Sequence, residues 1–597
     1  MIAELMLSLV VTAPWLALSW LVLNRVTGRG ADAGGTRHGP VPHTWTVALQ
    51  PTVLAPLAVL MAAVLVPGGA RLELDFLLLG SVWLLDDGRR ALLLATALIW
   101  FAAAWQRARG ADCAPRNSKP KGRNTGRDAL FLLTFAGNLL VLVSLDAPGF
   151  FLGFALMGLA IIPLIARPVG STGHGLGPHR LAHRAAAVTL ALTILGEGLL
   201  LSALVMAAAG APDLMLASLA ANMNGPALTF ALLALGIKLG APLLHLWLPL
   251  AYTSAPAPIA AVLSGALMSA GAFALLNLLP LGREGFAAWG QVMIGVGLFS
   301  TFYAVAVGLC QRLPGALLGY SSMSQMGLLM ALLGWTLTQG SVAGIATATA
   351  LVVTVYAIHH GLLKGALFLL VGRRGAPSHA LTVTLVALLG LALAGLPLTS
   401  GWWAKELLKT TLADAPWAWL LSISGIATTL LMARLVLLIR HRALAFRPGH
   451  RVRVGARSAV AALLGAPVLM YLASGENTPG WPGLIATWPV WLGVVLAPLL
   501  LGGGKALRLP RIRPGDIPLV IVDRLSARRG TPIKPTPGER KLPTQPDTPA
   551  PLTGAVTSSA KASNEGFEAA LRQWPHAGLA LLVNTVVLIL ILVIAPL

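Results

Sequence analysis

The sequence predicts an all-α, polytopic membrane protein with about 16 transmembrane helices, arranged around two inverted five-helix repeats with broken helices. Of its 597 residues 56% are hydrophobic and only 11% are charged, so a soluble fold would need an interior larger than its surface. Apolar runs of roughly 20 residues recur along the chain, and each can cross a hydrocarbon core of about 30 Å. A lysine and several prolines interrupt the apolar stretch from Gly236 to Gly271, and such interruptions are typical of transport proteins.

The first apolar run begins close to Met1 and is followed by Asn24 and Arg25. A cleaved signal peptide has positive charge before its apolar region and small residues after it, and this run has neither feature clearly. We therefore expect a retained first membrane span.

The two interrupted spans suggest how the chain is organised. Lys238 precedes Pro242 in one of them, and Lys405 follows Pro397 in the other. Broken helices at corresponding places in two halves are typical of inverted-repeat transporters. The expected parts are N-terminal helices (1–127), a first five-helix repeat (128–281), a second five-helix repeat (282–442), two further membrane helices (443–504), a proline-rich cytoplasmic strap (505–577) and a C-terminal membrane helix (578–597).

The formal net charge of +22 lies mostly in the connections between apolar runs. Basic and nearly uncharged connections alternate, as the positive-inside rule requires, so both termini are expected outside and the basic loops in the cytoplasm. The expected partner of these loops is an anionic lipid bilayer and not nucleic acid. The basic connections are 107–127, 167–184, 440–457 and 505–541, and their counterparts are 145–149, 210–226 and 475–485.

Redox, metal and hydrolytic chemistry have no support in the sequence. Cys113 and Cys310 are the only cysteines, and they lack the spacing of a disulfide framework, an iron–sulfur site or a zinc site. A nucleotide-binding loop and a nucleophile triad are also missing. We expect no catalytic residue, no metal and no cofactor in this chain, and any redox chemistry in another subunit.

Charged groups within spans are the candidate functional residues of the first block. Lys238 lies near the middle of its span, too deep to reach the interface easily. Glu197, in LGEGLLL, is central in the preceding span, and it is either a neutral acid bonded to a carbonyl or the partner of Lys238. A coupled acid and amine can pass protons because each charge tunes the pKa of the other. His245 follows the break and either relays protons or repairs the helix.

The second block offers a similar set. His360 and Lys364 are four residues apart and share one helix face, whereas His359 is expected to point elsewhere. Lys405 is followed by Glu406, and adjacent helical residues do not face each other. Hydroxyl and amide groups could support a water file, although hydroxyls in membrane helices often bond their own backbone. These are Ser321, Ser322, Ser324 and Gln325, beside Tyr320.

Four blocks of sequence carry a family resemblance: KLGAPLLHLWLPLAYTSAPAPIAAVLSG, GYSSMSQMG, HHGLLKGALFLLVG and GLPLTSGWWAKELL. Together they resemble the antiporter-like, proton-conducting membrane subunits of respiratory complex I, of Mrp-type sodium/proton antiporters and of membrane-bound hydrogenases. The resemblance implies a core of two inverted repeats, proton transfer along a central polar axis and assembly with partner subunits. It assigns Lys238 and Lys405 as the central lysines of two half-channels and His360 and Lys364 to the axis between them.

The chain departs from that family at several positions. Ala155 stands where a glutamate is usual, Met268 where many members have lysine, and Gln325 where many have histidine. We hypothesise that Glu197 supplies the missing carboxylate from the neighbouring span.

The expected function is that of a proton-translocating membrane subunit of a multisubunit ion-pumping complex, complex I-like or Mrp-type. Whether the chain counts as an enzyme is open, since it would be the translocase subunit of an NADH/quinone- or hydrogenase-like complex. Two alternatives remain: a proton-channel partner of an inorganic-carbon uptake complex, and a degenerate structural subunit that no longer conducts. Expected partners are other membrane subunits and a cytoplasmic redox or zinc-containing subunit. The expected location is the bacterial cell inner membrane, with multiple passes.

Overall fold

The computed structural model describes residues 2–26, 49–111, 125–166, 177–371, 379–443, 453–474, 487–501 and 512. Cys113, the C-terminal helix expected at 578–597 and the proline-rich strap, apart from Ile512, lie outside the described residues.

The described residues of the N-terminal part form three helices and a hairpin. The hairpin was not expected, because the sequence reading placed only a connection between the second and third spans. Strands β1 and β2 pair antiparallel, with Ala70 opposite Leu85. The elements are α1 (Ile2–Val26), α3 (Pro51–Leu65), β1 (Ala70–Leu74), β2 (Ser81–Leu85) and α4 (Asp87–Ala111).

Asp146, which is 1% exposed, fastens this hairpin to the next block. Its carboxylate accepts a hydrogen bond from the Val82 N–H at 2.9 Å and caps the following helix by accepting from the Gly149 N–H at 2.6 Å. An aspartate at this position supplies an acceptor for the N–H groups that have no partner in the first turn of a helix.

The next block of helices contains the first break. Asn224 caps α10 by accepting from the Ala227 N–H at 2.9 Å, and Pro226 occupies the first turn, where no donor is needed. The elements are α5 (Thr125–Val143), α6 (Ala147–Ala160), α7 (Ile162–Ile165), α8 (Gly177–Ala208), α9 (Leu216–Ala221), α10 (Gly225–Leu239), α11 (Trp247–Ser254), α12 (Ala257–Val262), the π-helical turn η1 (Leu263–Leu267) and α13 (Met268–Leu278).

The remaining helices include the second break, between α17 and α18. They are α14 (Ala287–Leu309), α15 (Pro314–Thr338), α16 (Ile345–Val371), α17 (His379–Ala394), α18 (Ser400–Thr411), α19 (Trp419–Ala443), α20 (Arg453–Ser474) and α21 (Trp488–Leu501).

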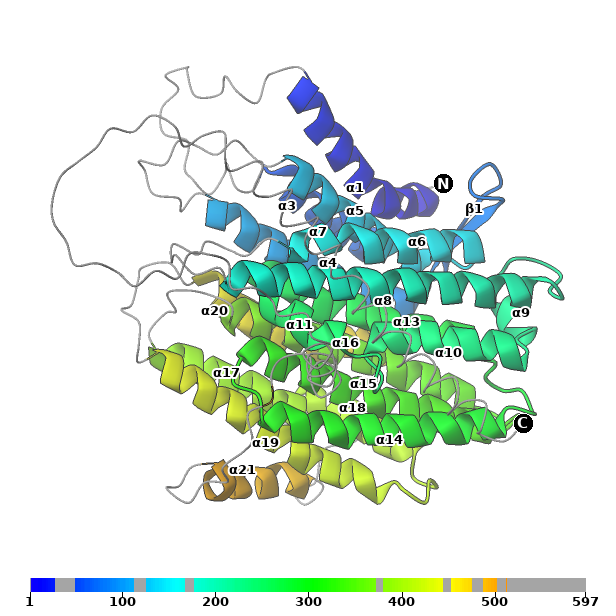
Figure 1. The fold of residues 1–597 in the computed structure, drawn as a ribbon. Helices are drawn as coiled ribbons and strands as arrows, with labels where there is room; N and C mark the ends of the chain where they lie inside the picture. The colour runs from blue at the N-terminus through cyan, green and yellow to red at the C-terminus, as the bar shows by residue number, and fades with distance from the viewer. Residues whose placement is uncertain are drawn as a thin grey trace, which may run out of the picture.

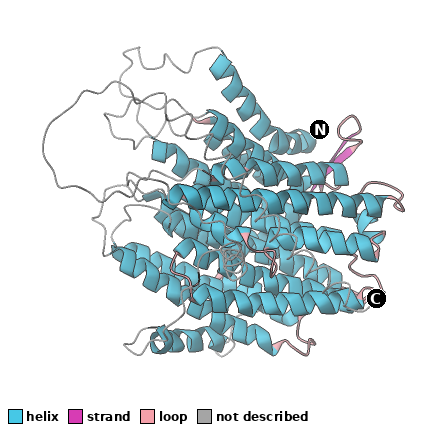
Figure 2. Cartoon of the chain, in the orientation of Figure 1, coloured by secondary structure: helices cyan, strands magenta, loops and turns pink. Residues whose placement is uncertain are grey.

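The long helices run side by side along one direction, as Figure 1 shows for α8, α10 and α14. Within the described residues, 11 helices are long and apolar enough to cross a membrane, and four shorter apolar helices accompany them. Figure 2 shows that the β-hairpin lies at one end of this bundle. The all-α, multi-pass membrane fold is therefore confirmed. The number of crossings and the inverted repeats stay predictions.

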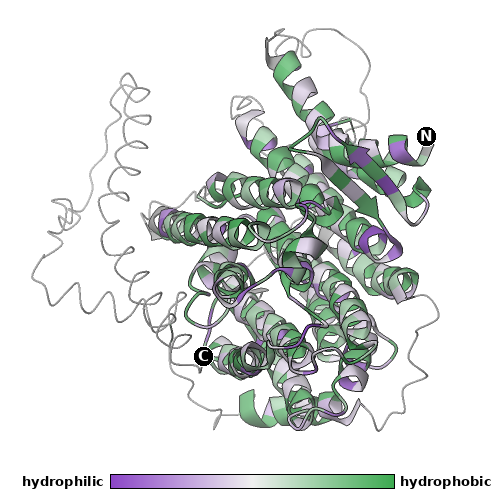
Figure 3. Ribbon diagram, turned by 90° about the vertical axis from the view of Figure 1, so that its right-hand side faces the viewer, coloured by the Kyte–Doolittle hydropathy of each residue, from purple (hydrophilic) through white to green (hydrophobic). Residues whose placement is uncertain are grey.

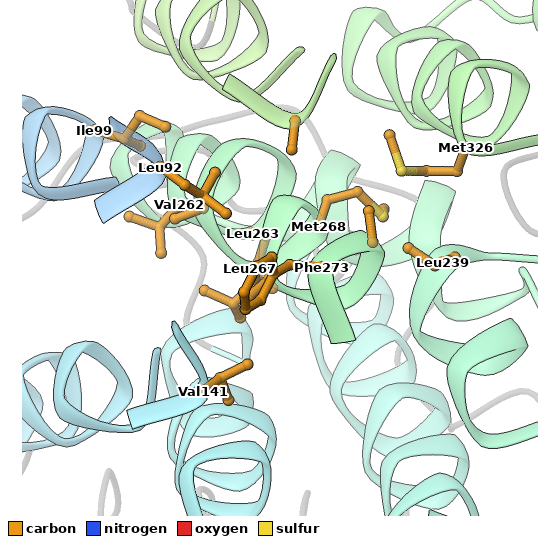
Figure 4. Packing of buried hydrophobic residues seen from close by; sticks show 14 of the residues in the cluster. Leu92, Ile99, Val141, Leu239, Val262, Leu263, Leu267, Met268, Phe273 and Met326 are labelled. Carbon is orange, nitrogen blue, oxygen red and sulfur yellow. The ribbon is translucent and has the colours of Figure 1, made fainter. Parts of the chain in front are cut away.

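Hydrophobic residues predominate along most helices, as the hydropathy colours in the view along the bundle show (Figure 3), and they include both buried and exposed side chains. Helices from distant parts of the chain meet in the centre, where Ile99 of α4, Leu263 of η1 and Met326 of α15 belong to one packed cluster (Figure 4). Polar groups inside such a core are costly unless they have partners, so each one is informative.

Candidate functional site

The first break lies between α10 and α11, where the sequence reading placed it. Gly240 (φ +71°) and Leu243 (φ +68°) have left-handed backbone, and Pro242 between them has no N–H to continue a helix. The Ala241 N–H closes the helix end by donating to the Gly236 carbonyl at 2.7 Å. The Trp247 indole, which follows the break, donates to the Ile237 carbonyl, which precedes it, at 2.7 Å. This hydrogen bond links the two helix segments across the break.

The second break, between α17 and α18, has the same construction. Gly395 (φ +104°) and Leu398 (φ +63°) are left-handed, with Pro397 between them. The Leu396 N–H donates to the Leu391 carbonyl at 3.0 Å. The Ala394 carbonyl accepts a hydrogen bond from the Lys405 amine at 2.8 Å, so here a lysine braces the helix end.

Lys238 lies in the last turn of α10, directly before the first break. Its Nζ is 3.9 Å from Oε1 of Glu197 on α8, and the two side chains are 15% and 12% exposed. Nζ also lies 5.0 Å from the centre of the Phe154 ring on α6, at cation–π distance. The pairing expected from the sequence is therefore present, and three helices contribute to the site.

Besides Phe154, the α6 residue that faces this ion pair is Gly158, a position that the sequence did not single out. A Cβ atom at Gly158 would lie 2.7 Å from Oε1 of Glu197 and 3.4 Å from Nζ of Lys238. The Glu197 carboxylate thus occupies space that a side chain on α6 would otherwise fill. The sequence missed this because Ala155 and Gly158 are three residues apart on one helix, and only packing shows which of them meets the lysine.

A cavity of about 30 Å³ adjoins the pair, and it is lined by Thr189, Glu197, Lys238 and Met268 among other residues. Roughly 10–15 Å³ of such space accommodates one water molecule when polar partners are present. The carboxylate and the amine are such partners, so the cavity can hydrate the ion pair.

His245 lies within the first break and is 1% exposed. Its ring is 5.8 Å from that of Tyr303 and 5.9 Å from that of Tyr320, measured between centroids. The ring is packed between aromatic side chains of α14 and α15, and both expected roles, proton relay and helix repair, stay open.

Lys364 on α16 is fully buried, and its amine donates to the Leu318 carbonyl on α15 at 3.0 Å. His360, one turn earlier, is also fully buried, and neither ring nitrogen has a hydrogen-bond partner within the described part of the chain. Ser322 and Ser264 approach within 3.2 Å between their hydroxyl oxygens. A polar strip therefore crosses the apolar core between η1, α15 and α16.

Gln325 on α15 links two more helices. Its side-chain carbonyl accepts a hydrogen bond from the Tyr356 hydroxyl, and its amide donates to the Thr428 hydroxyl at 3.1 Å. The hydroxyls of Ser321 and Ser324 have no hydrogen-bond partner among the described residues, although both are buried. Gln325 is thus held by hydrogen bonds between α16 and α19, and the hydroxyls of Ser321 and Ser324 on the same helix remain available to bond water.

The sequence reading left His359 without a role, and the structure places it against α18. His359 Nδ1 is 2.9 Å from the hydroxyl oxygen of Ser400, the first residue of α18. Nothing in the sequence pairs these two positions, because they lie 41 residues apart. The sequence signal for a role of His359 is only that it lies next to His360 in a membrane span.

Lys405 and Glu406 point to different neighbours. Glu406 lies 4.0 Å from the Lys409 amine, whereas Lys405 bonds the Ala394 carbonyl. A second cavity borders both residues and is also lined by Gly395 and Thr487. The geometry therefore agrees with the expectation that Lys405 and Glu406, as adjacent helical residues, do not face each other.

Comparisons with known proteins agree with this architecture. Residues 144–431 match the family described as NADH:quinone oxidoreductase/Mrp antiporter, TM. The NAD(P)H-quinone oxidoreductase chain 4 of Synechococcus sp. (strain CC9605) is 34% identical over 154 residues, which are 25% of this chain and 27% of the relative. The corresponding protein of Prochlorococcus marinus (strain MIT 9301) is 34% identical over 145 residues, 24% of this chain and 25% of the relative. The chain spans about a quarter of the length of these curated relatives.

Two solved structures share the fold over most of both chains. A chain of the Mrp complex from Dietzia sp. DQ12-45-1b superposes with a TM-score of 0.56 at 18% identity, covering 83% of this chain and 94% of that one. A chain of the membrane-bound sulfane sulfur reductase, an archaeal respiratory membrane complex, gives 0.60 at 17% identity, covering 82% and 99%. Residues 144–431, which contain both breaks and both lysines, are thus similar to the antiporter-like membrane subunits of NADH:quinone oxidoreductases and Mrp antiporters.

Proposed function

We propose that this chain is a proton-translocating membrane subunit of a multisubunit ion-pumping complex. The observation that carries the proposal is the Glu197–Lys238 ion pair, held 3.9 Å apart beside a cavity at a helix break. A charged amine within a membrane span costs at least about 2.5 kcal/mol, so an amine kept there together with a carboxylate indicates ion transfer.

The proton route uses the polar groups between the two breaks. It begins at Glu197 and Lys238, continues along the strip that contains Lys364 and His360, and ends at Lys405. His245, which lies within the first break, and Glu406, which borders the second cavity, flank this route. Helix breaks at Pro242 and Pro397 supply backbone groups that water can bond inside the membrane.

Three features of the surroundings belong to the same proposal. The two broken helices are corresponding elements of inverted repeats, since both have the same Gly-Xaa-Pro-Leu construction. The partners are other membrane subunits, joined by a cytoplasmic redox or zinc-containing subunit that provides the driving force. The location is the inner membrane of a bacterium.

The alternative of a non-conducting structural subunit is less well supported. Met268 does line the cavity in place of a polar residue, which weakens one possible step. Yet Lys238, Lys364 and Lys405 are all held inside the helical core, and a subunit that only binds its neighbours gains nothing from three amines whose burial destabilises the fold.

The decisive experiment measures proton flux in proteoliposomes that contain the chain with its co-purified partner subunits. A potassium diffusion potential set with valinomycin drives the flux, and 100 mV supplies about 2.3 kcal/mol per proton. We expect Lys238→Ala and Lys405→Ala each to lower the flux at least tenfold. Arg71→Ala, which removes an exposed cation from the hairpin, serves as the control. Unchanged flux in both lysine variants would refute the proposal.

A further inference from the structure

His359 occupies an unusual position on α16. It is 1% exposed and directly precedes His360, so the two imidazoles leave the helix about 100° apart. Nδ1 shares a hydrogen bond of 2.9 Å with the Ser400 hydroxyl, and Nε2 has no hydrogen-bond partner among the residues that the structure describes. One nitrogen is therefore engaged with α18, while the other is available to accept a proton.

The ring lies against the face of α18 that carries the second lysine. A Cβ atom at Gly401 would lie 3.0 Å from Cε1 of His359, so the imidazole touches the α18 backbone there. Gly401 and Lys405 are four residues apart and share one face of the helix. The imidazole thus stands at the start of the strip of α18 that leads to the Lys405 amine.

A purely structural function explains this arrangement poorly. Leaving a buried ring nitrogen without a partner costs about 1–3 kcal/mol, and an asparagine or glutamine could make the bond to Ser400 with no ring at all. Histidine differs from these residues in one respect that matters here. It can take up a proton on one nitrogen and release another from the opposite nitrogen.

We propose that His359 is the proton relay between the buried row of His360 and Lys364 and the lysine at the second break. The proposal rests on the proposed function of the whole chain. In the forward step Nε2 binds a proton that arrives from the side of His360, and Nδ1 releases its own proton to the Ser400 hydroxyl. The hydroxyl passes on the hydrogen it already carries, and the neutral Lys405 amine ends as an ammonium. Exchange of the imidazole tautomer then resets the relay.

The test compares His359→Gln with Ser400→Ala in the reconstituted complex, using the valinomycin-driven flux assay. Glutamine keeps a hydrogen bond to Ser400 but cannot carry a proton, so we expect at least a tenfold loss of flux without loss of assembly. Ser400→Ala keeps the imidazole and removes its partner, and we expect at least a threefold loss. Ser424→Ala is the matched control, because that buried hydroxyl bonds the Leu421 carbonyl of its own helix, at 2.7 Å.

The outcomes separate this inference from the proposed function. Full flux in His359→Gln, together with lost flux in Lys405→Ala, would show that His359 only positions α18 and would overturn the relay. Unchanged flux in both Lys238→Ala and Lys405→Ala would overturn the proposed function instead. If the glutamine variant does not assemble, Ser400→Ala decides, and flux equal to that of Ser424→Ala would count against the relay.

Discussion

The two helix breaks have the same backbone and different electrostatic partners. At both, a glycine with positive φ is followed by Xaa-Pro-Leu, and the leucine is left-handed as well. At the first break the amine of Lys238 precedes the glycine and faces a carboxylate from α8. At the second the amine of Lys405 follows the proline and bonds a backbone carbonyl. The local sequence thus builds the break, whereas a neighbouring helix decides which group the lysine meets.

This difference shows that the helix next to a break decides whether its buried lysine has a carboxylate partner. At the first break α6 contributes Gly158, and the Glu197 carboxylate occupies the space that a side chain at this position would need. At the second break no carboxylate lies within ion-pair distance of Lys405 in the described part of the chain, and Glu406 pairs with Lys409. The first lysine faces a carboxylate, and the second donates a hydrogen bond to a backbone carbonyl.

Exchanging the carboxylates for amides should give the largest contrast between the two sites. We expect Glu197→Gln to lower proton flux at least tenfold, because it removes the only charge opposite Lys238 among the described residues. Glu406→Gln should change flux less than threefold, because its partner is Lys409. Both are measured in the reconstituted complex, and equal losses would show that the two lysines have equivalent partners after all.

Filling the space on α6 should disturb only the first site. Gly158→Ala places a methyl group 2.7 Å from the Glu197 carboxylate oxygen, so the carboxylate must move away from the lysine. We expect a three- to tenfold loss of flux. Gly198→Ala, next to Glu197 on α8, is the matched control, since nothing lies within 4 Å of the added atom. A Gly158→Ala variant that conducts like the control would mean that the carboxylate is not confined by α6.

The equivalence of the two backbones can be tested through stability. Gly240→Ala and Gly395→Ala both force a side chain into left-handed backbone, which costs about 1–3 kcal/mol at each break. We therefore expect similar drops in thermal unfolding temperature for the detergent-purified complex. A large drop in only one of them would show that the two breaks are not equivalent parts of the fold.

The smallest expected effect concerns the brace at the first break. Trp247→Phe keeps an aromatic ring but removes the indole N–H that donates to the Ile237 carbonyl. The lost hydrogen bond costs about 1–2 kcal/mol. Unfolding temperature should fall while flux changes less than twofold. A tenfold loss of flux would instead make the indole part of the proton route.

The sequence predicted features that depend on local chemistry. A proline within an apolar run indicated both breaks, because proline lacks an N–H and cannot continue the helix. The Glu197–Lys238 pair was foreseen because two charges in neighbouring spans must find each other inside a membrane. The importance of Gly158 and the contact of His359 with Ser400 could not be foreseen, since both depend on how separate helices rotate against each other. The hairpin at 70–85 was missed because each strand has only five residues and the second, Ser81–Leu85, does not alternate, although Ala70–Leu74 does.

The fastening of the hairpin by Asp146 has a mechanical consequence for the lysine site. Asp146 holds β2 and starts α6, and Gly158 lies twelve residues further along that helix, about 18 Å away at 1.5 Å per residue. A helix transmits axial and rotational displacement with little loss over such a length. A neighbour that moved the hairpin would therefore also move the start of the helix whose residue Gly158 lines the Lys238 cavity.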